Sequence, residues 1–251
     1  MAVTDKEQQL SSKPAPAHFA TTHWSIVWQA CQKDSPRAEA ALGQLYTAYW
    51  YPLYAFIRGR GYDVHDAQDL AQDFFASLVK KNHLECVSRE KGRFRSYLLG
   101  ALKHFLANEW HKERWEKRGG GHTLIFFDEV LAENRYSQEP GHDATPEKIY
   151  ERNWVSVLLE RVLMSLRAEQ EEAGKDRHFE ELKIFLSGEK SPESYAEIAA
   201  RLDMSEAAVK VAVHRLRQRY RELLRAEIAN TVANPGEVED ELRYLLSVLR
   251  G

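Results

Sequence analysis

Residues 191–225, SPESYAEIAARLDMSEAAVKVAVHRLRQRYRELLR, constrain the fold of this chain more than any other stretch. Ser194 and Ser205 are favourable N-cap residues, and each precedes apolar residues at helical spacing. Between the two helices so predicted, Asp203 and Met204 leave room only for a tight turn. A short helix, a turn of about three or four residues and a longer helix describe a helix-turn-helix motif. The sequence therefore predicts this motif, with its second helix beginning after Ser205.

The second helix of this motif combines an apolar face with a cationic one. At about 100° per residue, its apolar residues share one face: Val209, Val213, Leu216, Tyr220, Leu223 and Leu224. Its basic residues gather about 100° away, although the chain has a formal net charge of -3: Lys210, His214, Arg217 and Arg221. Arginine and lysine donate to guanine and neutralise phosphates when such a helix enters the major groove of DNA. The arrangement favours DNA binding over a solvated basic surface.

Helical periodicity recurs along the rest of the chain, whereas strand signals are scarce. The best strand candidate is the short stretch TLIFF, Thr123 to Phe127. In residues 64–81, by contrast, one apolar stripe follows helical spacing: Ala67, Leu70, Ala71, Phe74, Phe75 and Leu78. Asp66, Asp69 and Asp73 form a separate acidic stripe on the same predicted helix. The sequence therefore predicts an all-α protein.

A second cationic segment, residues 88–118, mixes positive charge with aromatic side chains. It holds nine Lys and Arg against four Glu, a net charge of +5, interleaved with Phe94, Tyr97, Phe105, Trp110 and Trp115. Cationic grooves with aromatic stacking platforms bind single-stranded nucleic acid. Phe94 and Tyr97, beside the turn at Gly92, are the better candidates to face such a ligand, whereas Phe105 fits the core. From composition alone, a nucleic-acid site and a purely structural segment are equally supported.

The chain divides into two predicted helical domains with flanking segments. Residues 1–21, rich in Ser, Pro and Ala, are expected to be a flexible leader. Residues 22–118 and 147–225 are the helical blocks, and residues 119–146 between them begin with three glycines and carry five acids against one arginine. Such a long segment with little periodicity is typical of a linker or a functional loop. Residues 226–251 form a C-terminal extension with an acidic amphipathic helix, which we expect to dock on the protein's own domains or to bind a regulator.

Composition argues against several classes of protein. No apolar run reaches the roughly 18 residues of a membrane helix, and the first residues hold no apolar core of a secretory signal. The two cysteines, Cys31 and Cys86, provide neither a disulfide framework nor a zinc site, which fits a reducing compartment. No Ser-His-Asp or Cys-His arrangement is evident, and the glycines at 119–121 lack the Gly-Lys-Ser/Thr ending of a phosphate loop. We therefore expect a cytoplasmic protein with no cofactor, no metal, no membrane association and no enzymatic activity.

Three segments together resemble the RNA polymerase sigma factors of the sigma-70 family, extracytoplasmic-function (ECF) type. DAQDLAQDFFASLV, residues 66–79, is similar to region 2.2 of that family, and FRSYLLGALKHFLANEW, residues 94–110, to regions 2.3 and 2.4. AEIAARLDMSEAAVKVAVHRLRQRYRELL, residues 196–224, resembles the region 4 signature. The three occur in the family's order. The resemblance implies a region 2 bundle in residues 22–118 and a region 4 helix-turn-helix in residues 147–225, joined by the long acidic linker.

The resemblance also implies a function, namely binding core RNA polymerase and directing promoter recognition, DNA melting and transcription initiation. The residues it implies for polymerase binding are Asp66, Asp69, Gln72 and Asp73. Those implied for the single-stranded −10 element are Arg89, Lys91, Arg93, Phe94, Arg95, Tyr97, Lys103 and Asn108. Those implied for the double-stranded −35 element are Ser205, Lys210, His214, Arg215, Arg217 and Arg221. An anti-sigma factor or the C-terminal extension is the candidate regulator.

The recognition helix departs from the family pattern at one place. Where the family usually has Thr-Val-Lys-Ser-Arg, residues 208–212 are Ala-Val-Lys-Val-Ala, so two polar contacts to bases are lost. Two other interpretations stay open. A stand-alone helix-turn-helix regulator with an N-terminal sensing or dimerisation bundle leaves the acidic helix and the aromatic, basic segment unexplained. An RNA-binding or scaffolding protein accounts for the charge but leaves the helix-turn-helix unexplained.

Overall fold

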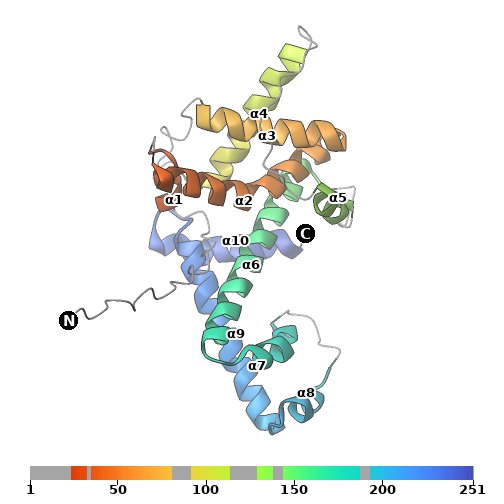
Figure 1. The fold of residues 1–251 in the computed structure, drawn as a ribbon, viewed down its shortest axis with the longest axis vertical. Helices are drawn as coiled ribbons and strands as arrows, with labels where there is room; N and C mark the ends of the chain where they lie inside the picture. The colour runs from red at the N-terminus through yellow and green to blue at the C-terminus, as the bar shows by residue number, and fades with distance from the viewer. Residues whose placement is uncertain are drawn as a thin grey trace, which may run out of the picture.

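A computed structural model describes residues 24–32, 35–80, 92–113, 129–137, 144–186 and 193–250. In this part of the chain every regular element is a helix, which confirms the all-α prediction for it (Figure 1). The elements are α1 (Trp24–Ala30), α2 (Pro36–Gly59), α3 (Val64–Lys80), α4 (Phe94–Glu113), α5 (Glu129–Ser137), α6 (Pro146–Glu172), α7 (Asp176–Leu182), η3 (Lys183–Phe185), α8 (Tyr195–Leu202), α9 (Glu206–Ala229), η4 (Pro235–Glu237) and α10 (Val238–Arg250). The strand candidate at residues 123–127 lies outside the described residues. None of the described helices is long and apolar enough to cross a membrane.

Helix α2 is the central helix of the larger hydrophobic core. Ser35 caps it by accepting a hydrogen bond from the backbone N–H of Arg37 at 3.2 Å, and Pro36 follows in the first turn, as the sequence predicted. From Ala48 to Ile57 every side chain is buried, so this half of α2 is covered on all sides. Helices α1, α3 and α6 pack against it. The aromatic residues in this half of α2 therefore form part of the hydrophobic core.

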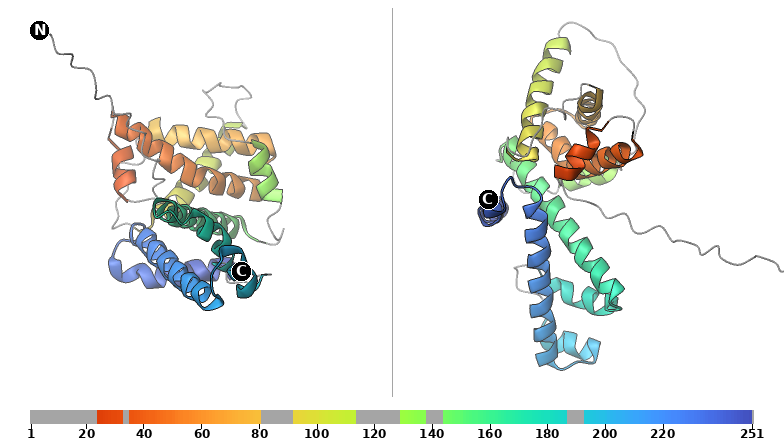
Figure 2. Two further views of the ribbon diagram at one scale, coloured as in Figure 1. Left: turned by 60° about the horizontal axis from the view of Figure 1, so that its bottom comes forward. Right: turned by 90° about the vertical axis from the view of Figure 1, so that its left-hand side faces the viewer.

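Two long helices, α6 and α9, run side by side and join two hydrophobic clusters (Figure 2). In the larger cluster, Trp154 of α6 and Ile228 of α9 pack with α2, α3 and α4. In the smaller cluster, Leu166 of α6 and Val213 of α9 pack with α7, η3 and α8. Because α6 and α9 contribute to both clusters, the predicted blocks at residues 22–118 and 147–225 are packed directly against each other.

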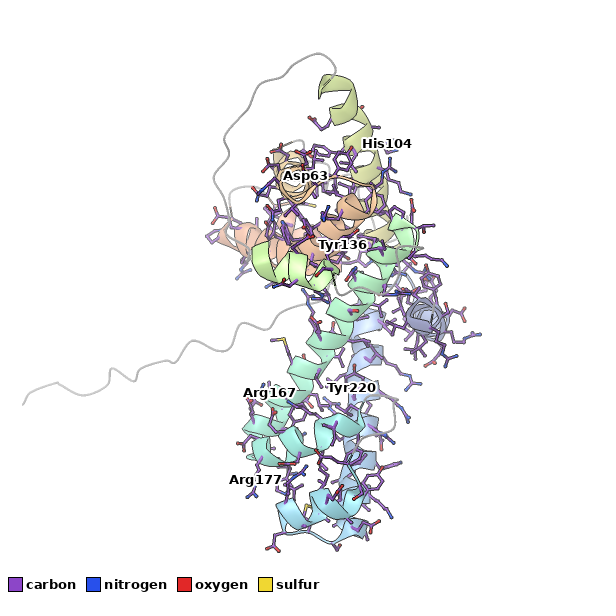
Figure 3. The ribbon with its side chains drawn as sticks, turned by 90° about the vertical axis from the view of Figure 1, so that its right-hand side faces the viewer. Asp63, His104, Tyr136, Arg167, Arg177 and Tyr220 are labelled. Atoms are coloured by element: carbon purple, nitrogen blue, oxygen red, sulfur yellow. The ribbon has the colours of Figure 1, made fainter. Side chains whose placement is uncertain are left out.

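Part of the segment expected to be a linker packs on α2 as helix α5. Glu133 of α5 accepts hydrogen bonds from Tyr54 Oη at 2.5 Å and from the Arg58 guanidinium at 2.8 and 3.2 Å. The same guanidinium lies 5.0 Å from the centroid of the Tyr136 ring, which faces α2 from α5 (Figure 3). Hydrogen bonding to Arg58 lowers the pKa of Glu133 and keeps it charged. Residues 129–137 are thus a docked helix, whereas the rest of the expected linker up to residue 143 lies outside the described residues.

The C-terminal extension ends in α10, which also docks on the larger cluster. Leu245 is buried in that cluster, and Val238, Leu242 and Val248 are partly buried against it. Helix α10 packs against both α6 and α9, and Figure 1 shows it crossing α6. The extension therefore packs on the protein's own helices, the first of the two roles expected of it.

Candidate functional site

The predicted helix-turn-helix consists of α8, a tight turn and α9. Ser194 and Glu197 cap α8 reciprocally: the Ser194 hydroxyl accepts from the backbone N–H of Glu197 at 3.3 Å, and the Glu197 carboxylate accepts from the backbone N–H of Ser194 at 2.7 Å. Asp203 ends α8 in the left-handed conformation, with φ 53°, and so turns the chain toward α9. Ser205 caps α9 by accepting from the backbone N–H of Ala208 at 3.2 Å. Both helices begin at the residues that the caps predicted.

The apolar face of α9 packs as its periodicity predicted. Val209, Val213 and Leu216 are buried in the smaller cluster together with Ile198 of α8. Arg177 of α7 adds a polar tie, because its guanidinium donates to the carbonyl oxygen of Arg201 in α8 at 2.7 Å (Figure 3). The inner face of the motif is thus held by packing, and the outer face of α9 is presented on a supported helix.

The outer face of α9 presents four of the predicted −35 contacts to solvent: Lys210, His214, Arg215 and Arg221. Lys210 Nζ pairs with Glu206 Oε1 at 2.6 Å, and this hydrogen bond raises the pKa of Lys210. No described residue forms an ion pair with Arg215 or Arg221. Val211 is 51% exposed beside them. The face therefore offers cationic donors next to an apolar side chain, a combination that can bind phosphate and contact a thymine methyl group.

Two of the predicted −35 contacts, Ser205 and Arg217, make hydrogen bonds that hold the motif together. The Ser205 hydroxyl is occupied as the cap of α9. Arg217 is half-buried, and its Nε donates to the carbonyl oxygen of Phe185 at 2.8 Å, which ties α9 to η3. Sequence reasoning had also passed over Arg219, whose guanidinium makes two hydrogen bonds to the Glu169 carboxylate of α6 at 2.7 and 2.8 Å. Phe185 and Glu169 are 32 and 50 residues away from these arginines, so helical spacing could not reveal them, whereas Glu222, a second partner of Arg219, is only three residues away.

The aromatic residues at the start of α4 are placed differently from the prediction. Phe94 is only 4% exposed, and its ring makes edge contacts with those of Trp24 and Tyr49, at centroid distances of 6.1 and 5.5 Å. It therefore packs in the core and does not face a ligand, because the hydrophobic surface of α1 and α2 meets the first turn of α4. Tyr97 stacks on Phe94 and is half-buried. Phe105 packs against the larger cluster, as expected.

The remaining polar residues predicted for the −10 element are spread along α4. Lys103 pairs with Glu147 of α6 at 2.7 Å, with both side chains 43% exposed. Asn108 is exposed one turn further along. Arg89 and Lys91 lie outside the described residues. Lys103 and Asn108 therefore lie on the accessible surface of α4, although Lys103 already has an acidic partner.

Arg93 and Arg95 converge on one buried carboxylate, that of Glu241 in α10. Arg95 Nη1 lies 2.5 Å from Glu241 Oε1, and Arg93 Nη2 pairs with Glu241 Oε2. The side chain of Glu241 is 0% exposed and that of Arg95 is 3% exposed. The Arg95 guanidinium also lies 4.5 Å from the centroid of the Trp154 ring. Arg95 is thus covered by α10 in this structure and is not exposed as expected, and the sequence had not singled out Glu241.

The acidic stripe of α3 lies on the solvent side of the larger core. Asp66, Asp69 and Asp73 are exposed and Gln72 is half-buried, whereas the apolar stripe of the same helix is buried or partly buried in the larger cluster. Asp63 caps the helix by accepting from the backbone N–H of Asp66 at 2.9 Å (Figure 3). Neither here nor elsewhere among the described residues do three or more His, Cys, Asp or Glu side chains form a group that could hold a metal. The three aspartates thus lie on the exposed face of α3, separate from its apolar stripe, as the helical spacing predicted.

Comparison with known families identifies one part of the chain. Residues 45–116 match the family model Sigma-70 region 2. The match starts in α2 and includes α3 and the whole of α4, and thus both the acidic stripe and the arginines at the start of α4. It supports a sigma-70 family sigma factor, a family that binds core RNA polymerase. The comparisons with curated proteins and with solved structures give no match.

Proposed function

We propose that this protein is a sigma factor of the extracytoplasmic-function type, which binds core RNA polymerase and directs promoter recognition, DNA melting and transcription initiation. The observation that carries the proposal is the match of residues 45–116 to sigma-70 region 2, on a bundle whose α3 exposes an acidic stripe. In this function the protein gives the polymerase its promoter specificity and catalyses no reaction itself. The helix-turn-helix of α8 and α9 supplies a second DNA contact.

Helix α3 is the proposed docking helix for the polymerase. Asp66 and Asp73 are seven residues apart, so the stripe extends over about 10 Å at 1.5 Å per residue. The opposite face, including Ala67 and Phe74, is buried, which holds the stripe at a fixed orientation. A row of carboxylates on a rigid helix favours a partner with complementary positive charge and accelerates the encounter.

Helix α9 is the proposed reader of the −35 element in double-stranded DNA. Its exposed cations, Arg215 and Arg221 above all, suit phosphate contacts and contacts to guanine. Val211 takes the place of a polar reader, and its exposed side chain suits the methyl group of thymine. Ser205 and Arg217 contribute by positioning the helix. This distribution supports anchoring to the DNA backbone with limited polar reading of bases.

The start of α4 is the proposed receiver of the single-stranded −10 element. Arg93, Arg95 and Tyr97 provide cations and an aromatic ring, the combination that holds unstacked bases and their phosphates. Lys103 and Asn108 extend the surface along the same helix. An unstacked base must be received by such a surface because unstacking costs a few kcal/mol.

Reconstitution with core RNA polymerase tests the proposal directly. The purified full-length protein is mixed with core enzyme, and transcription is assayed from genomic fragments. A stable complex and promoter-dependent transcripts are expected. Absence of both would refute the sigma-factor function, and sequence-specific duplex binding by the protein alone in that case would favour a stand-alone helix-turn-helix regulator.

A charge-reversal pair tests the docking helix. Asp69→Lys combined with Asp73→Lys is expected to abolish or strongly reduce polymerase association, because both side chains lie on the exposed stripe. The matched control, Glu171→Lys with Glu172→Lys, makes the same change of charge at the exposed end of α6. Association of the stripe variant at the level of the control, with unchanged circular dichroism, would show that α3 is not the docking helix.

A further inference from the structure

We infer that α10 is an autoinhibitory latch, that is, a helix that blocks a binding site of its own chain. Its residues Glu241 and Tyr244 bind the side chains of Arg93 and Arg95 and so close the −10 site of the free protein. The inference rests on the proposed function, since that function makes the start of α4 a binding site for single-stranded DNA. It goes further by assigning the C-terminal extension a role in regulating that site.

The carboxylate of Glu241 takes the position in which the arginine pair would hold a phosphate. It forms ion pairs with both guanidinium groups from outside α4, with Arg95 Nη1 at 2.5 Å from Oε1 and Arg93 Nη2 beside Oε2. Carboxylate and phosphate are the anions that guanidinium groups bind best, and they present similar oxygen pairs to it. Glu241 is 0% exposed and Arg95 is 3% exposed, so while α10 is docked a nucleic-acid phosphate cannot reach the Arg95 guanidinium. The Arg93 side chain stays 36% exposed, but its guanidinium is already paired with Glu241.

An aromatic ring of α10 lies over the same two arginines, where a base of single-stranded DNA would stack. The Tyr244 ring centroid lies 5.5 Å from the Arg93 guanidinium and 5.7 Å from that of Arg95. Single-stranded DNA offers the same two groups to a protein, an anionic phosphate and a flat base that stacks on arginine. Helix α10 therefore satisfies both the charge and the stacking capacity of this surface.

Besides its apolar packing on the larger cluster, α10 is held by polar contacts that contribute little stability and are suited to release. Arg225 Nε of α9 pairs with Glu239 Oε1 at 2.7 Å, but the two side chains are 49% and 61% exposed, and such pairs contribute little. Arg95 Nε is buried without a hydrogen-bond partner in the described part of the chain, so the buried ion pair is incompletely satisfied. Buried ion pairs of this kind stabilise a fold weakly. A buried leucine would serve better for stability alone, and the charge of Glu241 matches the site it covers.

The first test compares binding of a single-stranded oligodeoxynucleotide of mixed sequence to three full-length proteins. Glu241→Gln keeps the shape of the side chain but removes the anion, and it is expected to bind about tenfold tighter than the native protein, within the roughly 5–150-fold range of such couplings. Asp240→Asn is the matched control, since it removes a charge from the exposed side of α10, where Asp240 pairs with Arg243. The control is expected to bind like the native protein.

A second variant keeps the proposal testable if Glu241→Gln does not fold. Tyr244→Ala leaves Glu241 in place and removes the ring over the two arginines together with the hydrogen bond to Glu151 of α6. It is expected to bind the oligonucleotide more tightly than the native protein, by a smaller factor than Glu241→Gln. Circular dichroism establishes that each variant is folded before binding is measured.

Hydrogen exchange on the native protein tests the same coupling without any substitution. If strand and α10 compete, then adding the oligonucleotide must accelerate exchange in α10, because coupling between two sites is reciprocal. Amides of α2, in the core, are expected to keep their protection. Unchanged exchange in α10 at saturating oligonucleotide, with equal affinity of native and Glu241→Gln proteins, would overturn the latch.

Transcription with core polymerase separates failure of the latch from failure of the proposed function. Promoter-dependent transcription by both proteins, with no effect of Glu241→Gln on oligonucleotide binding, removes the latch and leaves the sigma-factor function standing. Tighter oligonucleotide binding by Glu241→Gln without any polymerase-dependent transcript removes the sigma-factor function and leaves the latch standing.

Discussion

Replacing Ile198 with alanine is expected to unfold the helix-turn-helix while leaving the larger core intact. Ile198 is 0% exposed and packs in the smaller cluster, to which ten of the described residues contribute buried side chains. Alanine removes three carbon atoms, which lowers the burial free energy by about 2.4 kcal/mol at about 0.8 kcal/mol per carbon. The cavity left behind raises the total loss to about 3–4 kcal/mol. A small cluster has little stability to spare, so a loss of this size opens it locally.

Hydrogen exchange measured by mass spectrometry is the appropriate assay, because it reports each helix separately. A loss of about 3–4 kcal/mol corresponds to exchange about 10²–10³ times faster in α8 and the first half of α9. Ile198→Val should accelerate exchange there only about 2–10-fold, since it costs about 0.5–1.5 kcal/mol. Ala200→Ser, on the exposed side of α8, is the control. Duplex DNA binding should fall with the loss of α8, while polymerase association persists.

Equal acceleration in α2 and α8 would refute this reasoning. Helices α6 and α9 belong to both clusters, so such a result would show that they couple the whole chain into one cooperative unit. Loss of polymerase association together with DNA binding would lead to the same conclusion. Unchanged exchange in α8 would show instead that the smaller cluster repacks around the cavity.

Two further predictions concern Arg215, Arg217 and Glu133. Arg215→Ala should weaken duplex binding evenly across sequences and reduce its salt slope by about 1, measured by fluorescence anisotropy. Arg217→Ala should instead lower the free energy of unfolding by about 1 kcal/mol, and so lower Tm, because the hydrogen bond to Phe185 is lost. An unchanged Tm with an altered base preference in Arg217→Ala would show that Arg217 reads bases. The pKa of Glu133 is lowered from 4.5 by Arg58, so its contribution to docking α5 is complete above that pH and is lost as the pH falls through the depressed value. Limited proteolysis across pH should show α5 released on acidification, and Glu133→Gln should remove this pH dependence; the same profile in the variant would exclude Glu133 as the cause.

The local structure of the chain was predictable because its signals lie within a few residues. Ser194 and Ser205 mark the starts of α8 and α9, since a cap bonds to backbone groups two or three residues away. The apolar and acidic stripes of α3 follow from helical geometry alone. The apolar face of α9 was correctly assigned for the same reason. These features describe each helix by itself.

The roles of individual charged residues depended on how the helices pack. Arg217 bonds to Phe185, 32 residues earlier, and Arg58 to Glu133, 75 residues later. Neither partner can be chosen from spacing, because many acids and carbonyl groups lie at such distances along the chain. Phe94 was misplaced for a related reason, since an aromatic residue beside a basic turn looks the same in sequence whether it meets DNA or α1 and α2.

For Glu241, the sequence predicts burial, and the tertiary structure shows its partners. In the sequence it shares an apolar stripe with Val238, Leu245 and Val248, at intervals of three and four residues, so its burial follows from helical geometry. The spacing does not predict which cations pair with the Glu241 carboxylate. Only the packing of α10 against α6 and α9, beside the start of α4, brings Glu241 to Arg93 and Arg95. The sequence by itself determined the helices and their faces, and the tertiary structure decided which charges meet, because ion pairs form between surfaces that only the folded chain brings together.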